Sequence, residues 1–376
     1  MKDYRKVTAL YASLLVTISA NVMADTFTTE KHNVEYEVVA EGLANPWAVA
    51  FLPEGGMLIT ERHGQLRIIN SQGILEADPI AGLPEISEHG QGGLLDVVLH
   101  PEFKENRWIY FSYAERERGS YGTTVSRGRL VGRKLEQLQT IFEMTRKTSS
   151  RHHFGSRLVF DREGRLFITL GDRGDRPRAQ DLNDHAGSVI RLFDDGSTPP
   201  QNPFSGKSGQ LAEIYSYGHR NIQGAALHPA TGELWIHEHG PQGGDEINLP
   251  KPGKNYGWPV ITYGVNYVIG TKIGEGTHKA GMEQPVHYWV PSIAPSGMTF
   301  YSGEKFNNWK GNLFVGSLKF QQLVRLELKG ETIIHEERLL SGELGRIRDV
   351  REGPDGHIYL ITDENNGRLI RLIPTK

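Results

Sequence analysis

The sequence contains no cysteine among its 376 residues. Without thiols the chain cannot form disulfide bonds, thiolate metal sites or a cysteine nucleophile, and it cannot carry the lipid of a lipoprotein. A bacterial periplasm remains a compatible compartment, because a domain of this length buries enough surface without covalent crosslinks.

Basic tracts and long helical patterns are also scarce. No run of Lys and Arg is interleaved with aromatic residues, which argues against a nucleic-acid partner and leaves a small molecule as the expected one. Apolar residues rarely follow a helical period, and short apolar runs instead end at Gly, Pro, Asn or Asp. The chain has 44 glycines, well above the usual share of about 7 per cent. These features predict an all-β protein with many tight turns.

The first 24 residues differ from the rest of the chain. Three basic residues precede an apolar run at about residues 7–22, and the small residue Ala24 follows it. This order predicts a secretory signal peptide, residues 1–24, and hence a periplasmic or secreted protein without stable membrane insertion. A retained N-terminal anchor is the alternative, although Thr8, Ser13, Thr17 and Asn21 make the run a poor membrane span. Cleavage would leave a mature chain with a formal charge of about −5, because the removed segment holds three basic residues and one acidic residue.

One pattern recurs along the remaining chain: an apolar strand, a turn with Pro, Asp or Gly, a second apolar strand, and a polar Gly-rich loop. Six copies occur, at residues 47–60, 94–113, 157–170, 223–237, 297–317 and 348–362. The copies begin about 47 to 74 residues apart, which favours four-stranded blades over solenoid repeats. We therefore predict a six-bladed β-propeller in a single domain, residues 25–376. An open sandwich or a two-domain protein is the alternative.

The segment 213–249 has polar clusters on both sides of a predicted hairpin. Strands at 225–227 and 233–236 enclose a turn that is longer than two residues. The start of one antiparallel strand lies beside the end of the next, so the clusters at 218–221 and 237–246 should meet. We expect a functional site at this end of the hairpin.

Residues at the same phase of successive blades converge on one mouth of the central channel. This rule gathers seven side chains around one opening: Gln91, His153, Arg220, Asn221, Lys319, Arg346 and Arg348. Arg346 and Arg348, two positions apart on a strand, should point the same way and share a ligand. The positive charge suits a ligand with several carboxylates.

Several long motifs occur in a characteristic order. They are GQGGLLDVVLHPEF (90–103), HFGSRLVFDREGRLFITLGD (153–172), SYGHRNIQG (216–224), EHGPQGGDEIN (238–248), KNYGWP (254–259), GSLK (316–319) and RIRDVREGPDGHIYLITDE (346–364). In these motifs the chain resembles the soluble quinoprotein glucose dehydrogenases, and among them the bacterial aldose sugar dehydrogenases. The resemblance runs from about Leu43 to the C-terminus. It implies a six-bladed propeller, pyrroloquinoline quinone (PQQ) and calcium.

The resemblance also implies an activity and a set of site residues. The activity is PQQ- and Ca²⁺-dependent oxidation of aldose sugars at the anomeric carbon to lactones, with electrons passed to an unidentified acceptor. His153 matches the catalytic base, a role that suits a neutral imidazole. The residues that match contacts or neighbours of the cofactor are Gln91, Arg220, Asn221, Asp245, Lys319, Arg346 and Arg348, with Tyr267 as a stacking surface for the planar cofactor. Gly240 and Pro241 match calcium ligands through their backbone carbonyls, and Glu246 and Tyr256 match a second, structural calcium site.

Some residues depart from the family pattern. His152 stands where the glucose enzymes have an acidic residue, and His239 stands where they have Gln. The loop at 287–292 aligns poorly with their aromatic-rich loop near the substrate. These departures leave the cofactor chemistry intact and leave the preferred sugar undetermined.

Two other functions remain open. A metal-dependent propeller lactonase or hydrolase would need a cage of Glu, Asp and Asn around a channel metal, whereas the predicted ring is mainly cationic and amide. A non-catalytic propeller that binds a ligand or protein is the other alternative.

Three further patterns have ordinary structural explanations. The DRGDR run at 172–176 is interpreted as surface ion pairs rather than a calcium loop. His237 and His239 could bind a transition metal, but a third ligand is not evident. His152 is expected to face away from His153, because adjacent residues on a strand point to opposite sides.

Overall fold

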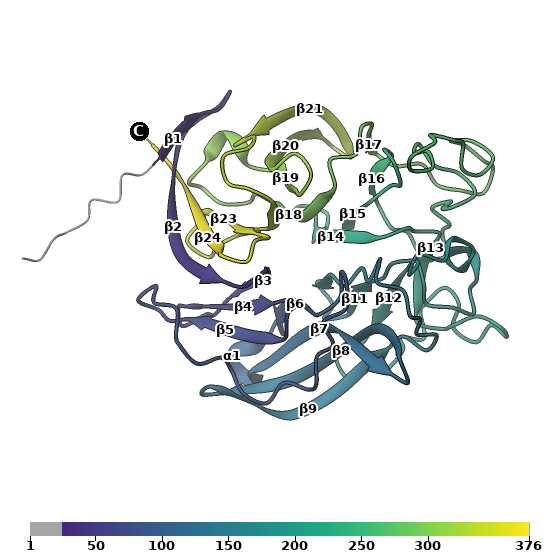
Figure 1. The fold of residues 1–376 in the computed structure, drawn as a ribbon, viewed down its shortest axis with the longest axis horizontal. Coiled ribbons are helices and arrows are strands. Elements are labelled where there is room, and N and C mark those ends of the chain that lie inside the picture. Colours follow the sequence, from purple (N-terminus) through teal and green to yellow (C-terminus); the bar gives the residue numbers. More distant parts are fainter. Residues whose placement is uncertain (1–24, 376) are drawn as a thin grey trace, which may run out of the picture.

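Six β-sheets surround a central axis in the computed structural model, which describes residues 25–375 (Figure 1). The predicted signal peptide, residues 1–24, lies outside this part. Helix is confined, within the same residues, to α1 (Phe103–Asn106) and the 3-10 helices η1 (Arg176–Gln180) and η2 (Asn307–Trp309). No helix between residues 25 and 375 is long and apolar enough to cross a membrane. The prediction of an all-β, six-bladed propeller is confirmed.

The blades follow one another in chain order. Blade 1 consists of β3 (Pro46–Phe51), β4 (Met57–Glu61) and β5 (Gln65–Ile69). Blade 2 consists of β6 (Leu94–Leu99), β7 (Trp108–Glu117), β8 (Ser120–Val131) and β9 (Lys134–Glu143). Blade 3 consists of β10 (Leu158–Phe160), β11 (Leu166–Thr169), β12 (Ser188–Leu192) and β13 (Ile214–Tyr217). Blade 4 consists of β14 (Ile222–Leu227), β15 (Leu234–Glu238), β16 (Asp245–Asn248) and β17 (His287–Trp289). Blade 5 consists of β18 (Pro295–Phe300), β19 (Leu313–Ser317), β20 (Gln322–Lys329) and β21 (Thr332–Leu339). Blade 6 consists of β22 (Ile347–Glu352), β23 (Ile358–Thr362), β24 (Gly367–Pro374), β2 (Asn33–Leu43) and β1 (Asp25–Thr28).

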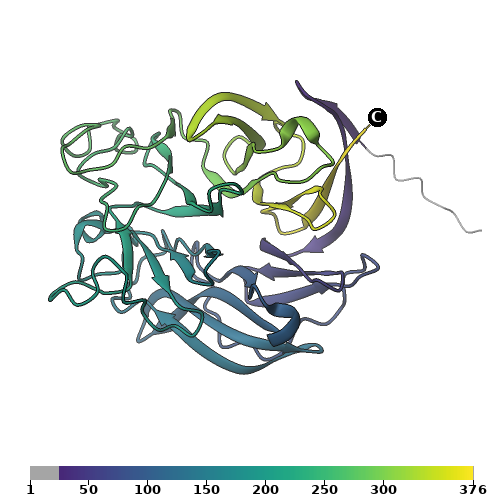
Figure 2. The same ribbon diagram turned by 180° about the vertical axis from the view of Figure 1, so that it is seen from behind.

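The six sequence repeats correspond to the first two strands of each blade. The innermost strands form a closed ring, in which β3 contacts β6, β6 contacts β10, and so on through β14, β18 and β22 back to β3. The N-terminal strand β2 completes blade 6, because it pairs antiparallel with β24 on the outer side of that blade (Figure 2). The repeat pattern did not reveal this pairing, which covers the edge that β24 would otherwise expose.

Hydrophobic clusters lie between neighbouring blades. One joins Leu58 of blade 1 to Phe111 of blade 2, and another joins Ile59 of blade 1 to Ile361 of blade 6. The other four interfaces within residues 25–375 are filled in the same way. Apolar residues on both faces of each sheet therefore hold the blades together and leave the channel end of the innermost strands to polar residues.

The innermost strands carry β-bulges near their first residues. Pairing skips Trp47 between β3 and β4, Gln223 between β14 and β15, and Arg348 between β22 and β23. A bulge leaves its extra residue unpaired and changes the direction of its side chain. These three bulges position the functional site described next.

Candidate active site

The bulged starts of the innermost strands surround a cavity of about 1060 Å³, here called the larger cavity. Seven residues predicted from the sequence line it: Gln91, Asn221, Pro241, Tyr267, Lys319, Arg346 and Arg348. A smaller cavity of about 420 Å³ shares Gln91 and Tyr267 with the larger one. His153 and Arg220 line the smaller cavity. The fold thus brings together residues that are distant in the sequence.

The larger cavity has more cations than anions. Arg346 and Arg348 contact the carboxylate of Asp363 at 3.2 and 2.7 Å. Burial acts to raise the pKa of Asp363, but the charges of Arg348 and Arg346 outweigh it and lower the pKa to about 2. Lys319 adds a third cation, with its Nζ 5.1 Å from the ring centroid of Phe320. Arg62 also lines the cavity, so four cations and one carboxylate leave net positive charge for an anionic ligand.

The two arginines share Asp363 for a reason that differs from the one predicted. β22 begins at Ile347, so Arg346 precedes the strand, and Arg348 is the bulged residue. The alternation of a regular strand therefore does not apply to this pair. Asp363 follows β23, and its backbone N–H donates to the carbonyl of Arg346 at 2.7 Å, which brings the carboxylate to both guanidinium groups.

His153 lies in a left-handed backbone conformation, with φ of 55°. Its backbone N–H donates to Oε1 of Gln91 at 2.8 Å, a contact that holds this unusual conformation. Its ring Nδ1 lies 2.5 Å from Oδ1 of Asp172. An ionised carboxylate can only accept, so Nδ1 carries the proton and Nε2 keeps its lone pair. The side chain is 14% exposed and borders the smaller cavity, where Nε2 can accept a proton.

Asp172 fixes the His153 ring and is itself held by other donors. Its Oδ1 also accepts from the backbone N–H of Gly174 at 2.7 Å, and its Oδ2 accepts from Nε1 of Trp258 at 2.8 Å. Burial acts to raise the pKa of Asp172, but the hydrogen bond from His153 and the charge of Arg220 leave it below its ordinary value. The carboxylate is therefore ionised and stabilises an imidazolium that forms beside it.

The pH dependence of activity should report the protonation of His153. Burial lowers its pKa below 6.5, the hydrogen bond to Asp172 acts in the opposite direction, and the charges of Arg220 and His152 lower it further. A base must be neutral to accept a proton, so we expect kcat/KM to be constant above about pH 6.5 and to fall at lower pH. A pH–rate profile checks this expectation, and an acid limb centred above pH 7 would contradict it.

Two expectations about this region are wrong. The 172–176 run is not a set of surface ion pairs, because Asp172 and Arg173 are 0% and 1% exposed. Arg173 donates to the carbonyls of His152 and Ser150, and its guanidinium lies 3.5 Å from the ring centroid of Phe154. His152 does not face away from the base, since both histidines border the smaller cavity in a non-strand segment.

Asp172 and Trp258, which hold the candidate base in place, were not predicted from the sequence as site residues. Both residues stand inside quoted motifs, Asp172 three positions after the end of β11 and Trp258 in KNYGWP. An acidic residue shortly after an apolar strand was the available signal for Asp172. No comparable signal pointed to Trp258, because its contact with Asp172 spans 86 residues.

The polar ends of the predicted hairpin meet as expected. β14 pairs with β15, and the backbone N–H of His239 donates to the carbonyl of Asn221 at 3.0 Å. From the other side, Arg220 Nη1 donates to the carbonyls of His239 and Gly240 at 3.0 and 2.6 Å. The Arg220 guanidinium also lies 5.4 Å from the ring centroid of Trp258. Arg220 thus connects the loop after β15 to the indole that holds Asp172.

Asp245 accepts hydrogen bonds from the loops around the site and lines neither of the two cavities. Its Oδ1 accepts from the backbone N–H of Gly240 at 2.9 Å. Its Oδ2 accepts from the hydroxyl of Ser292 at 2.7 Å and from the backbone N–H groups of Ile293 and Ala294 at 2.8 and 2.9 Å. Each such bond to a charged group contributes about 1.5–3 kcal/mol. Asp245 is 0% exposed and joins the Gly240 loop to the segment that precedes β18.

The predicted structural cation site has a suitable set of oxygen atoms. Gly240, Glu246 and Tyr256 line one small cavity together with Glu238. Burial raises the pKa of Glu246 well above its ordinary value, and the charge of Glu238 adds to this effect. Nearby, the buried Oδ1 of Asn248 has no hydrogen-bond partner among the described residues. Two carboxylates and an unpaired amide oxygen fit a hard cation.

The residues predicted to bind cations would do so through different kinds of atoms. The Tyr256 hydroxyl donates to the carbonyl of Leu249, so the backbone carbonyl of Tyr256 is the atom left to bind a cation. Gly240 and Pro241 likewise would use their carbonyl oxygens. Over residues 25–375 no group of three or more His, Asp or Glu side chains is arranged to hold a metal ion. His239 instead donates from Nε2 to the carbonyl of Pro295 at 2.6 Å.

A family model described as Glucose / Sorbosone dehydrogenase matches residues 43–371. The chain belongs to this family. Aldose sugar dehydrogenase YliI of Escherichia coli (strain K12) is 49% identical over 347 residues, which cover 91% of this chain and 93% of the relative. This member of the Glucose / Sorbosone dehydrogenase family is therefore an oxidoreductase, as the resemblance implied.

Solved structures agree with this assignment. The soluble aldose sugar dehydrogenase from Escherichia coli in the apo-form matches with a TM-score of 0.88 and 48% identity, over 91% of this chain and 100% of that one. The PQQ-bound form of aldose sugar dehydrogenase from Streptomyces coelicolor matches with a TM-score of 0.73 and 27% identity, over 90% and 98%. The propeller of this family member is thus shared over nearly its whole length.

In this dehydrogenase the positions that depart from the family pattern border the two cavities. His152 lines the smaller cavity, while His239 and the segment 290–292 line the larger one. Burial lowers the pKa of His239 to about 3, so its ring is neutral and donates to Pro295. The departures therefore lie where a substrate or cofactor would touch the protein.

Proposed function

We propose that this protein oxidises aldose sugars at the anomeric carbon to lactones, with PQQ as cofactor and with a requirement for Ca²⁺. The observation that carries the proposal is the pair of His153 and Asp172 in the smaller cavity, directly beside a larger cavity lined by cations. The relatives named above as aldose sugar dehydrogenases support the substrate class. The Streptomyces coelicolor relative binds PQQ, which supports the cofactor.

The larger cavity fits a planar ligand with several carboxylates. Arg346, Arg348 and Lys319 would hold these carboxylates, because guanidinium and ammonium groups bind them by charge-assisted hydrogen bonds. The buried Nε of Arg348 has no hydrogen-bond partner within residues 25–375, so it has a free donor for such a ligand. Tyr267 is 57% exposed and borders both cavities, where its ring can stack on a planar ligand.

The cation would be held by backbone oxygen atoms. Gly240 and Pro241 would supply carbonyl ligands at the active site, and Arg220 and Asp245 hold this loop in place through Gly240. Glu246 and Tyr256 would supply the ligands of a structural cation. When bound, the quinone would accept hydride from the sugar, and calcium would polarise its carbonyl.

The protein's own residues would bind the sugar, orient it and remove a proton. Nε2 of His153 would accept the proton of the anomeric hydroxyl, since Nδ1 is committed to Asp172. Asp172 would stabilise the imidazolium that results. Gln91 would keep the base in place, because it accepts the backbone N–H of His153 and also lines both cavities.

A spectroscopic titration tests the proposal before any choice of sugar. Apo-protein with Ca²⁺ is titrated with PQQ, and we expect a saturable change in the absorption of the quinone. The loaded protein should then reduce a redox dye with glucose and other aldoses and release the lactone, and chelation of Ca²⁺ should lower this activity. No saturation by PQQ together with no dye reduction by any aldose would overturn the proposal.

We also propose that the protein acts in the periplasm or outside the cell. The N-terminal segment of basic, apolar and small residues supports this location. The acceptor that removes electrons from the reduced enzyme would then be a molecule of the same compartment. Fractionation of cells that express the full-length chain, with N-terminal sequencing of the product, tests the location and the cleavage after Ala24.

A further inference from the structure

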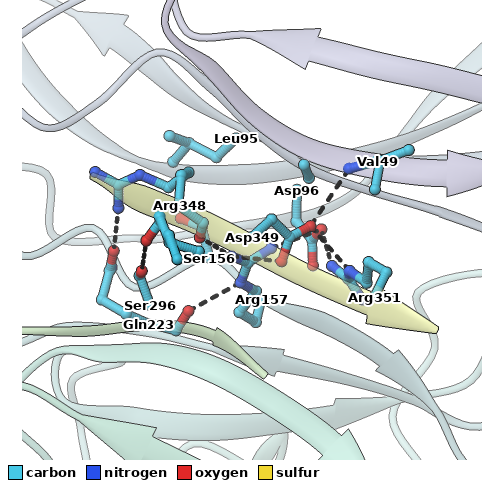
Figure 3. A network of polar contacts seen from close by, with 12 residues as sticks. Val49, Leu95, Asp96, Ser156, Arg157, Gln223, Ser296, Arg348, Asp349 and Arg351 are labelled. Atoms are coloured by element: carbon cyan, nitrogen blue, oxygen red, sulfur yellow. Dashed lines mark hydrogen bonds and ion pairs between the residues drawn. The ribbon is translucent and has the colours of Figure 1, made fainter. Parts of the chain in front are cut away.

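Four charged side chains, of which three are buried and Arg351 is 20% exposed, form a closed ring of ion pairs at the centre of the propeller (Figure 3). Arg157 contacts Asp96 at 3.3 Å and Asp349 at 3.0 Å. Arg351 contacts the same two carboxylates at 2.8 and 2.9 Å. Two positive and two negative charges alternate, so the ring is neutral as a whole.

The ring connects innermost strands that are far apart in the sequence. Asp96 belongs to β6 of blade 2, and Asp349 and Arg351 belong to β22 of blade 6. Arg157 directly precedes β10 of blade 3. Asp349 also accepts the backbone N–H of Val49 in blade 1, at 3.3 Å. Within the described chain, four of the six blades thus meet at this ring.

Arg157 makes a second set of contacts, and these reach the bulged residues Trp47, Gln223 and Arg348. Its Nε donates to the carbonyl of Gln223 at 2.9 Å, and its Nη2 donates to the carbonyl of Arg348 at 3.2 Å. Its guanidinium lies 4.0 Å from the ring centroid of Trp47. Figure 3 shows Arg157 between Gln223 and the strand that carries Arg348 and Asp349. One side chain therefore contacts the bulges of blades 1, 4 and 6.

These three bulged residues have a further property in common, since all of them line the larger cavity. Arg157 itself does not contribute to the lining of either cavity as described above, and its side chain is 2% exposed. Two of its partners also bond to each other, because Nη1 of Arg348 donates to Oε1 of Gln223 at 3.3 Å. A guanidinium fork can donate to two carbonyls and contact two carboxylates at the same time, which an ammonium group cannot do with the same geometry.

We propose that Arg157 is a positioning residue for the ligand of the larger cavity: it fixes the bulges of Trp47, Gln223 and Arg348, and so sets where the Arg348 guanidinium meets a ligand carboxylate. The inference rests on the proposed function, because PQQ is the ligand in question. Arg157 acts only through these neighbours and touches neither sugar nor cofactor.

The test compares Arg157→Lys with a matched change at a second buried arginine. Arg325 is 0% exposed and contacts Glu337 and Asn312 at 2.6 Å, but it lies on β20 of blade 5, away from the residues that line both cavities. We expect Arg157→Lys to raise the Kd for PQQ by about 10- to 100-fold, as for a disturbed hydrogen bond to a charged group. Arg325→Lys should lower the Tm to a similar degree and leave the Kd for PQQ unchanged.

Hydrogen exchange of the segment 347–352 gives a second readout that does not require PQQ. Exchange in this segment should be faster in Arg157→Lys than in the wild type or in Arg325→Lys, because the Arg348 bulge has lost its donor. If Arg157→Lys binds PQQ as tightly as the wild type, or if exchange in 347–352 is unchanged, Arg157 does not position Arg348. A wild type that binds no PQQ would count against the proposed function, and the exchange measurement would still decide the role of Arg157.

Discussion

Replacement of His153 by Ala is expected to lower kcat for aldose oxidation by about 10²- to 10⁴-fold, the usual contribution of a positioned general base. The side chain removed has a free ring nitrogen at the smaller cavity, and Asp172 is committed to its other nitrogen. The larger cavity and its cations are not altered by this change. PQQ binding by spectroscopic titration should therefore be retained while dye reduction is lost.

A matched control exists elsewhere in the chain. His185 is also a buried histidine paired with a carboxylate, since its Nε2 lies 2.7 Å from Oε1 of Glu213, but it packs against Phe142 between blades 2 and 3. His185→Ala should lower the Tm without a comparable loss of kcat. If His153→Ala retained the turnover of the wild type, or if His185→Ala lost as much, the role of His153 as the base would be refuted.

Asp172→Asn should have an effect of nearly the same size, about 10²- to 10⁴-fold in kcat. The carboxylate accepts three hydrogen bonds, from His153, Gly174 and Trp258, whereas an amide offers one acceptor oxygen and a donor in place of the other. The substitution also removes the negative charge that stabilises the imidazolium of His153. The base would be less basic, and its ring would lose its fixed tautomer.

The pH–rate profile separates this effect from a general loss of structure. Since the hydrogen bond to Asp172 raises the pKa of His153, its removal should move the acid limb of kcat/KM to lower pH than in the wild type. Glu213→Gln is the matched control, because it changes the partner of His185 in the same chemical way. An unchanged acid limb in Asp172→Asn, or an equal shift in Glu213→Gln, would exclude Asp172 as the partner that tunes His153.

Much of the fold could be predicted because it repeats. The six strand–turn–strand copies correspond to the first two strands of each blade, and their number defined the propeller. The radial arrangement then placed Gln91, Lys319 and Arg348 around one opening, where the structure has them. Local patterns were sufficient for this part, since strand period and turn residues act over short stretches of chain.

Other features could not be predicted because they depend on contacts between distant residues. The pairing of β2 with β24 joins an N-terminal strand to a C-terminal one, and the sequence repeats do not predict it. Asp172 and Arg173, in the run interpreted as surface charge, are buried, and Asp172 accepts a hydrogen bond from the indole of Trp258. Arg346 and Arg348 both form ion pairs with Asp363 because Arg348 is a bulged residue, and the alternation of a regular strand does not predict such a bulge.

The sequence by itself determined the number of blades and the kinds of residues at the mouth of the channel, because hydrophobic periodicity and residue chemistry are local properties. Only the tertiary structure decided which carboxylate holds His153 and which guanidinium supports the bulges at Trp47, Gln223 and Arg348. These choices depend on register shifts and on buried charges that must find partners within a few ångströms. The bulges that Arg157 contacts come from blades 1, 4 and 6, so strand pairing within one blade cannot bring them together, and only the closed arrangement of the six blades does.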